Sequence, residues 1–186
     1  MYRWLTHTFL VLLLILGVGA LACPVKSAAH EHEPAELEYK LKAAFLFNFA
    51  RFTTWPKTAE NRAIPFTLCV LGTDPFGAAL SGLQERSISG RAIKLYYADH
   101  LPNKLDQCQM LFVSKSEAAS LSSILKYVNG KPIVTVSDID GFVAANGMFE
   151  FVTTEGRLAF IINNSQAQAH GVHISSSLLN LAYKVQ

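Results

Sequence analysis

Two histidines near the end of the chain, His170 and His173, have the i, i+3 spacing with which one helix face could present two imidazoles to a metal ion. Gly171 lies between them and favours a helix stop, so we do not expect the two rings to share a face. A second candidate, the segment His30-Glu31-His32-Glu33, lies in a short polar stretch that we expect to be solvated. The sequence therefore predicts no metal site.

Polar side chains also follow three apolar runs that have the character of strands. Asp74, Ser114 and Asp138 come shortly after the carboxyl ends of these runs, where open α/β sheets bind ligands. They define one candidate site, for a small molecule. The alternative is a local role, in which Asp74 caps the helix that follows it, Asp138 caps the next turn, and Ser114 forms a capping box with Glu117.

The serine cluster Ser175-Ser176-Ser177 is the candidate for nucleophilic catalysis, but it has no G-x-S-x-G elbow and no evident histidine partner. Ser175 as the N-cap of a final helix accounts for it. The chain also has no glycine-rich phosphate loop, since Gly72 and Gly77 flank the acidic Asp74. The sequence therefore predicts a protein that is not an enzyme and needs no cofactor.

Residues 1–22 have the layout of a secretory signal peptide: Arg3, an apolar core of about fourteen residues, then small residues. A membrane span is the competing interpretation, but a span needs roughly 20 apolar residues. Cleavage could follow Ala22 or Ala29, and Cys23 leaves lipid attachment as an alternative. We expect an exported, periplasmic protein.

After the signal peptide we expect a flexible leader over 23–36 and one domain over 37–186, a length that supports a single core. The chain carries 16 basic against 14 acidic residues and no basic run, which predicts no nucleic-acid partner. Export also argues against kinases and ATPases, because no nucleotide pool feeds them outside the inner membrane.

Cys69 and Cys108 each lie in or beside an apolar run, and an oxidising compartment favours their pairing. The disulfide would join two strands of one sheet. Two buried free thiols and a redox switch are the alternatives that the residues leave open.

The first helix is expected from Ala35 to Trp55-Pro56, because the residue before proline avoids the helical conformation. Its buried face should carry the apolar residues that recur at about every fourth position. These residues are Leu41, Phe45, Phe49 and Phe52, with Leu46 beside them and with Lys40, Lys42 and Arg51 off the face.

Alternating strand and helix patterns predict an α/β fold with a mostly parallel central sheet, helices on its faces and a C-terminal antiparallel hairpin. A short helix is expected from Asp74-Pro75 to Leu83, one from Ser114 to Asn129-Gly130, one at Ser165–His170 and one after Ser175. The strands are expected at 66–71, 93–97, 108–113 and 133–136, with the hairpin at 148–154 and 157–162 joined by Glu155-Gly156.

Two stretches of the chain resemble the YfiR-like family. One is the entry helix, Tyr39-Lys40-Leu41-Lys42-Ala43-Ala44-Phe45-Leu46-Phe47-Asn48-Phe49-Ala50-Arg51-Phe52-Thr53-Thr54-Trp55-Pro56. The other is the closing segment, with Val134–Asp138, Gly141-Phe142, Gly147-Met148, Phe160–Asn163, Gly171–Ser176 and Leu178-Leu179. The resemblance covers roughly 37 to 183 in order.

This resemblance implies a small periplasmic α/β protein, frequently a homodimer, that represses an inner-membrane diguanylate cyclase by binding the cyclase's periplasmic part. It also implies that an OmpA-like outer-membrane lipoprotein sequesters the protein. Cyclic-di-GMP production and biofilm formation are then the processes that the protein regulates. Cys69 and Cys108 match the positions bridged in that family. A second cysteine pair near the closing segment is absent, which puts redox control through that pair in doubt. The alternative function is a small-molecule binding module with its site at the strand ends.

The hairpin region supplies the candidate contacts with a partner: Phe142, Phe149, Phe151 and Arg157. A late antiparallel hairpin added to a parallel sheet can present one face to another protein. The alternative is that the three aromatic side chains close the core.

Overall fold

The computed structural model describes residues 32–57, 64–101 and 105–186. The expected signal peptide and most of the expected leader lie outside these residues. The chain divides into two units, Met1–His32 and Glu33–Gln186, and the fold that follows is that of the second unit. In the described part of the chain, no helix is long and apolar enough to cross a membrane.

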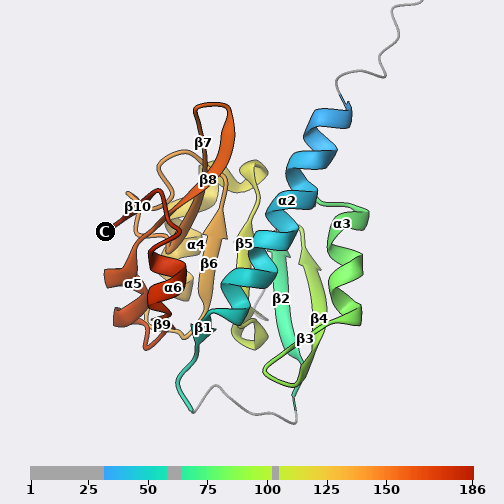
Figure 1. The fold of residues 1–186 in the computed structure, drawn as a ribbon. Helices are drawn as coiled ribbons and strands as arrows, with labels where there is room; N and C mark the ends of the chain where they lie inside the picture. The colour runs from blue at the N-terminus through green and yellow to red at the C-terminus, as the bar shows by residue number, and fades with distance from the viewer. Residues whose placement is uncertain (1–31, 58–63, 102–104) are drawn as a thin grey trace, which may run out of the picture. The chain divides into compact units, whose positions relative to one another are not determined.

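The domain is built on a curled sheet of eight strands in the order β10-β8-β7-β6-β5-β2-β4-β3 (Figure 1). The run from β4 to β7 is parallel, β8 and β3 are antiparallel to their neighbours β7 and β4, and β10 runs parallel to β8. The predicted fold class is confirmed. The strands are β2 (Phe66–Leu71), β3 (Ser87–Ile88), β4 (Arg91–Ala98), β5 (Met110–Val113), β6 (Val134–Ser137), β7 (Phe149–Thr154), β8 (Arg157–Ile162) and β10 (Lys184–Val185).

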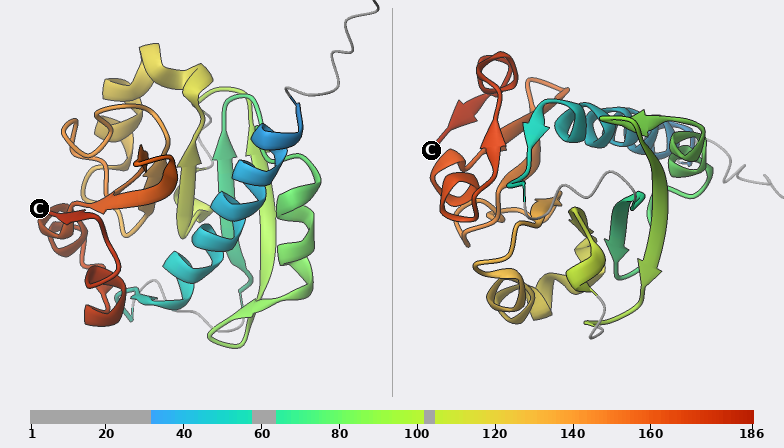
Figure 2. Two further views of the ribbon diagram at one scale, coloured as in Figure 1. Left: turned by 45° about the horizontal axis from the view of Figure 1, so that its top comes forward. Right: turned by 90° about the horizontal axis from the view of Figure 1, so that it is seen from below.

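Helices cover both faces of this sheet, with α2 on one face and α4 on the other (Figure 2). A two-stranded antiparallel sheet of β1 (Thr53–Thr54) and β9 (His173–Ile174) follows α2. The helices are α2 (His32–Arg51), α3 (Ala78–Ser81), α4 (Leu121–Val128), α5 (Asn164–Ala169) and α6 (Ser176–Leu179), with 3₁₀ turns η2 (Gly82–Glu85), η3 (Leu105–Gln107) and η4 (Lys115–Ser120).

Two separate hydrophobic cores result, because successive side chains of a strand point to opposite faces of the sheet. In β2, Leu68 and Val70 enter the core beneath α2, whereas Cys69 and Leu71 enter the core beneath α4. The same division holds in β5, and in β6 Val134 and Val136 enter the core beneath α2. Burial on both faces explains why the central strands read as unbroken apolar runs in the sequence.

Helix α2 differs from its prediction in its start, its end and its buried face. It ends at Arg51 rather than at Trp55-Pro56, so Phe52 lies just beyond it. It begins at His32, so the end of the expected leader is helical. Its fully buried residues include Leu46 and Phe49, but Leu41 is 47% and Phe52 39% exposed, whereas Lys42 is only 2% exposed. The helix is apolar over more of its circumference than the sheet covers, so periodicity alone did not identify the face in contact.

Aromatic side chains of α2 pack against the β7–β8 hairpin. The Phe49 ring stacks on Phe149 at 4.5 Å between centroids and lies 4.9 Å from Phe160. Phe45 lies 6.0 Å from Phe151 and is half-buried. The helix is therefore seated on the β7–β8 hairpin as well as on the parallel strands.

Two of the expected helix caps are wrong. Asp74 Oδ1 accepts a hydrogen bond from the Phe76 backbone N at 2.9 Å, closing a turn, and α3 begins only at Ala78. Ser114 makes no side-chain cap, and the chain after it forms the 3₁₀ turn η4 before α4 starts. In both places the chain turns tightly after a strand and enters its helix later than the capping pattern indicates.

Other local predictions are confirmed. Glu155 and Gly156 join β7 to β8 with φ values of 51° and 72°, as a tight two-residue hairpin turn requires. The Ser175 hydroxyl accepts a hydrogen bond from the Leu178 backbone N at 3.3 Å and caps α6.

Cys69 and Cys108 form a disulfide, as the sequence predicts. Cys69 lies in β2 and Cys108 lies just before the neighbouring strand β5, with both in the core beneath α4. The bond closes a loop of sequence separation 39.

Replacing both cysteines by alanine should lower the free energy of unfolding by about 4 kcal/mol. The reason is that the unfolded chain regains the conformational entropy that a cross-link closing a loop of this length removes. Guanidinium unfolding of the two proteins measures the difference. Mass spectrometry of non-reduced peptides should show the linked pair, and two thiols open to alkylation in the native protein would contradict the prediction.

Candidate functional site

The three predicted ligand residues follow adjacent strands, since β2, β5 and β6 lie side by side in the sheet. Each is already engaged within the domain. Asp74 closes the turn described above, Ser114 is buried, and Asp138 is covered by α2 at 3% exposure. While α2 is in place, the Asp138 carboxylate is closed to a ligand from solvent.

Asp138 instead anchors a buried cluster with residues of α2. Its Oδ2 accepts hydrogen bonds from Lys42 Nζ at 2.6 Å and from the Tyr39 hydroxyl at 2.8 Å. The Lys42 ammonium also lies 2.6 Å from Glu38 Oε1 and 4.2 Å from the centroid of the Tyr39 ring. Sequence reasoning missed Lys42 and Tyr39 as partners of Asp138, because nothing local links positions separated by 96 residues.

The surroundings of Tyr39 keep its hydroxyl protonated. Burial, and then the hydrogen bond to Asp138, raise the pKa of Tyr39, so its hydroxyl stays protonated and donates. The expected capping role of Asp138 is wrong, because the next backbone amide, Ile139 N, is bound by Ser137 Oγ at 3.0 Å. The cluster therefore joins α2 to the end of β6.

A buried acid in the hairpin, Glu150, was also missed. Its two carboxylate oxygens accept hydrogen bonds from the backbone N of Gly141 at 3.0 Å and of Val143 at 2.8 Å. It holds the loop between β6 and β7 against the sheet. A single acid between two buried phenylalanines of an alternating strand was the signal that could have identified it.

Of the four predicted partner contacts, three are inside the domain. Phe142, Phe149 and Phe151 are buried, so in this conformation their side chains cannot reach a partner, and they close the core as the alternative held. Arg157 is exposed at the start of β8, and its contact with a partner stays a prediction.

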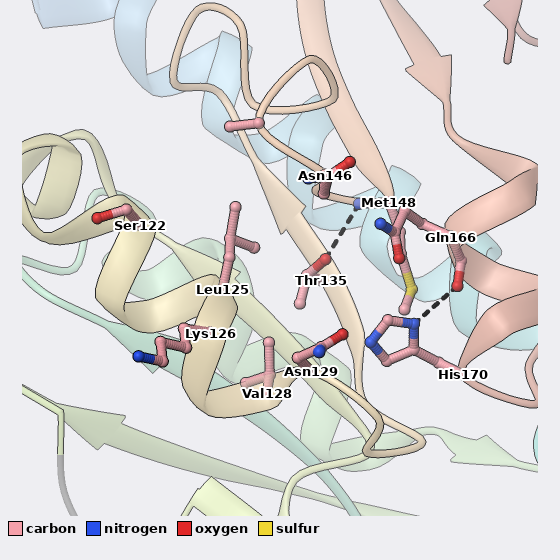
Figure 3. Close-up of a pocket in the computed structure, with 11 residues that line it drawn as sticks. Ser122, Leu125, Lys126, Val128, Asn129, Thr135, Asn146, Met148, Gln166 and His170 are labelled. Carbon is pink, nitrogen blue, oxygen red and sulfur yellow. Dashed lines mark hydrogen bonds between the residues drawn. The ribbon is translucent and has the colours of Figure 1, made fainter.

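A cavity of about 490 Å³ lies on the α4 face of the sheet, between α4, the loop before β7 and α5 (Figure 3). Of the described residues that line it, none is acidic, and Lys126 and His170 are its cationic or protonatable groups. The lining is formed by Ser122, Leu125, Lys126, Val128, Asn129, Thr135, Ala145, Asn146, Met148, Gln166 and His170.

The His170 imidazole points across this cavity toward Asn129 (Figure 3). Its Nδ1 lies 2.8 Å from the Gln166 carbonyl oxygen, which leaves Nε2 as the nitrogen open to a ligand. Thr135, in β6, accepts a hydrogen bond from the Met148 backbone N at 3.0 Å. Most of the lining side chains are polar, and Leu125, Val128, Ala145 and Met148 are the apolar ones. A threonine inside an apolar strand was the available signal in the sequence.

The two histidines considered as metal ligands are separated by the end of α5. His170 is the C-cap residue, Gly171 follows with a φ of 71°, and His173 lies in β9. Among the described residues, no group of three His, Cys, Asp or Glu side chains could hold a metal ion.

The fold defined by these elements is an α/β domain with one disulfide, in which α2 covers one face of a mostly parallel sheet and α4 covers the other. The sequence profile of the YfiR/HmsC-like family matches residues 39–183, from α2 to the segment before β10, and the chain belongs to this family. No curated protein matches the chain.

Replacing Lys42 by methionine should lower the free energy of unfolding by about 3–5 kcal/mol, because it leaves the buried Asp138 carboxylate without its cation. Lys40→Met is the matched control, since the Lys40–Glu36 pair is exposed on the same helix and should contribute only about 0.3–0.5 kcal/mol. Denaturant unfolding separates the two variants. A Lys42→Met, Asp138→Leu double variant should recover much of the loss, and equal effects at Lys40 and Lys42 would contradict the assignment.

Proposed function

We propose that this protein is a periplasmic regulatory binding protein that represses an inner-membrane diguanylate cyclase by binding the cyclase's periplasmic part. Repression would lower cyclic-di-GMP and biofilm formation. The observation that carries the proposal is membership of the YfiR/HmsC-like family over residues 39–183, nearly the whole described domain. The Cys69–Cys108 disulfide supports an oxidising compartment.

Regulation across a membrane needs only a surface that binds one cyclase conformation more tightly than another. A shift of the cyclase from 1:99 to 99:1 takes about 5.5 kcal/mol of differential affinity. Helix α2 offers exposed apolar side chains for such binding, with Leu37 59% exposed and Leu41 beside it one turn further on. We further propose a homodimer and sequestration by an OmpA-like outer-membrane lipoprotein.

Deleting the gene should raise cellular cyclic-di-GMP, because an unrepressed cyclase stays active. The rise should disappear when the partner cyclase is also deleted. Extraction and mass-spectrometric quantification of cyclic-di-GMP in the single and double deletion strains measure both effects. An unchanged level in the single deletion would overturn the regulatory proposal.

Arg157→Glu should weaken repression without unfolding the domain, since Arg157 is exposed on the hairpin. Lys94→Glu is the matched control, because Lys94 is exposed on β4, near the other end of the sheet. Complementation of the deletion strain with each variant, together with the melting temperature of each purified protein, tests the role. Full repression by a normally folded Arg157→Glu protein would remove Arg157 from the interface.

The cavity beneath α4 supports a second candidate function, the binding of a small molecule. Because Lys126 and His170 contribute to its lining and no described lining residue is acidic, we propose an anionic ligand with an apolar part. This site lies on the opposite face of the sheet from the Asp138 cluster.

A ligand of this class at 100 times its Kd should raise the melting temperature by about 5–10 °C, since saturation stabilises the folded state by about 2.7 kcal/mol. Thermal-shift measurements with small aromatic and aliphatic carboxylates test it. The shift should be lost in Lys126→Glu and kept in Lys94→Glu. A panel without any Lys126-dependent shift would argue against an anionic ligand in the cavity.

A further inference from the structure

A groove of about 330 Å³ separates α2 from the segment formed by α3 and η2. Small residues on both walls, Ala44 on α2 and Ala79 and Gly82 on the other side, leave room for another chain. A Cβ built on Gly82 would meet no atom within 4 Å. We call this surface the α2–α3 groove, and it is lined by Lys40, Ala43, Ala44, Phe47, Asn48, Arg51, Ala79, Gly82, Leu83 and Arg86.

The charges of the α2–α3 groove have one sign. Lys40, Arg51 and Arg86 line it, and none of the described lining residues is acidic. Lys40 is paired with Glu36 at 2.6 Å, but across the residues described no carboxylate lies within ion-pair distance of Arg51 or Arg86. Two arginines facing one groove without acids are the complement of an anionic partner.

A shared aromatic ring positions these two arginines. The Arg86 guanidinium carbon lies 4.9 Å from the centroid of the Phe47 ring, and that of Arg51 lies 5.7 Å from the same centroid. A cation–π contact of this kind favours a position of each guanidinium over the ring, and the planar guanidinium carries several N–H donors. Both forks are therefore held ready for carboxylates, which arginine binds through two parallel hydrogen bonds.

An apolar stretch of α2 continues the groove on its amino-terminal side. Leu37 and Leu41 are one turn apart, and Leu41 is three residues before Ala44, so all three lie along one side of the helix. Both leucines are exposed. A chain that reaches the arginines can therefore also bury an apolar side chain against α2.

We propose that the α2–α3 groove is the docking site for an acidic segment of a protein partner that carries at least one large apolar side chain. Carboxylates of the segment bind Arg51 and Arg86, and the apolar side chain packs on Leu37 and Leu41. That this partner is the periplasmic part of a diguanylate cyclase rests on the proposed function; the preference of the groove for an acidic segment does not.

The test of the groove itself uses a phage-displayed library of short random peptides selected on the purified protein. The selected peptides should be rich in Asp and Glu with a Leu, Ile or Phe. Their affinity should fall about 10- to 100-fold in the Arg51→Glu, Arg86→Glu double variant, the range for the loss of charge-assisted hydrogen bonds. Arg86→Lys should lower the affinity for the peptides less, because it keeps the positive charge and removes only the paired N–H donors of the guanidinium group.

Lys94→Glu is again the control: it reverses one positive charge outside the groove, where the double variant reverses two inside it, and it should bind the selected peptides normally. Selection of neutral or basic peptides, or undiminished binding by the double variant, would overturn the proposal. If no acidic peptide is selected and inorganic phosphate at millimolar concentration displaces the peptides that are, the groove binds a free anion. That result would also overturn the proposal.

The identity of the partner is tested separately in cells. A photo-crosslinking amino acid at Ala79, inside the groove, should crosslink to the periplasmic part of the cyclase, and one at Ala92, exposed on β4, should not. Crosslinking at Ala92 alone would move the cyclase interface away from the groove. If the deletion strain has unchanged cyclic-di-GMP but acidic peptides are selected, the cyclase is ruled out as the partner. The docking site for an acidic segment is then still supported.

Discussion

The buried ion pair between Lys42 and Asp138 determines where the first helix lies. A charged pair out of water is tolerated only with close geometry and further hydrogen bonds, and here Tyr39 and Glu38 supply them. Once Lys42 must reach the carboxyl end of β6, the rotation of α2 is set. Phe49 then meets the hairpin, while Leu37 and Leu41 are turned to the outside.

The two faces of the sheet carry different features of the domain. The face beneath α2 carries the ion pair and the aromatic contacts with the hairpin, and its outer surface carries the α2–α3 groove. The face beneath α4 contains the disulfide and borders the open cavity. A partner protein and a small molecule would therefore meet opposite faces of one sheet, and neither needs to displace the other.

The central strands and the hairpin could be predicted because their signals are local: apolar runs for strands buried on both faces, and Glu155-Gly156 for the turn. The disulfide followed from the position of both cysteines beside such runs. The sequence could not predict which face of α2 is buried. Six apolar positions competed for contact with the sheet, and the residue that decides the face is a lysine. The burial of Lys42 depends on Asp138, and no periodicity within the helix carries that information.

The candidate sites show the same division between local and distant information. Asp74, Ser114 and Asp138 were placed correctly at strand ends, but the sequence did not show that α2 closes over Asp138. The cavity and the groove each combine residues of separate elements whose side chains are individually unremarkable polar or small groups. Only the fold brings α4 near α5, and α2 near α3 and η2, so that these residues line one cavity or one groove.

The pairing of β1 with β9 has a consequence for the order of folding. Thr53, just after α2, pairs with Ile174, and Lys42 of α2 is hydrogen-bonded to Asp138, so these contacts join the start of the domain to chain that comes late in the sequence. Contacts between positions so distant in sequence must wait for loop closure, and they slow folding. Helix α2 therefore completes its contacts only when β6, the hairpin and β9 are in place.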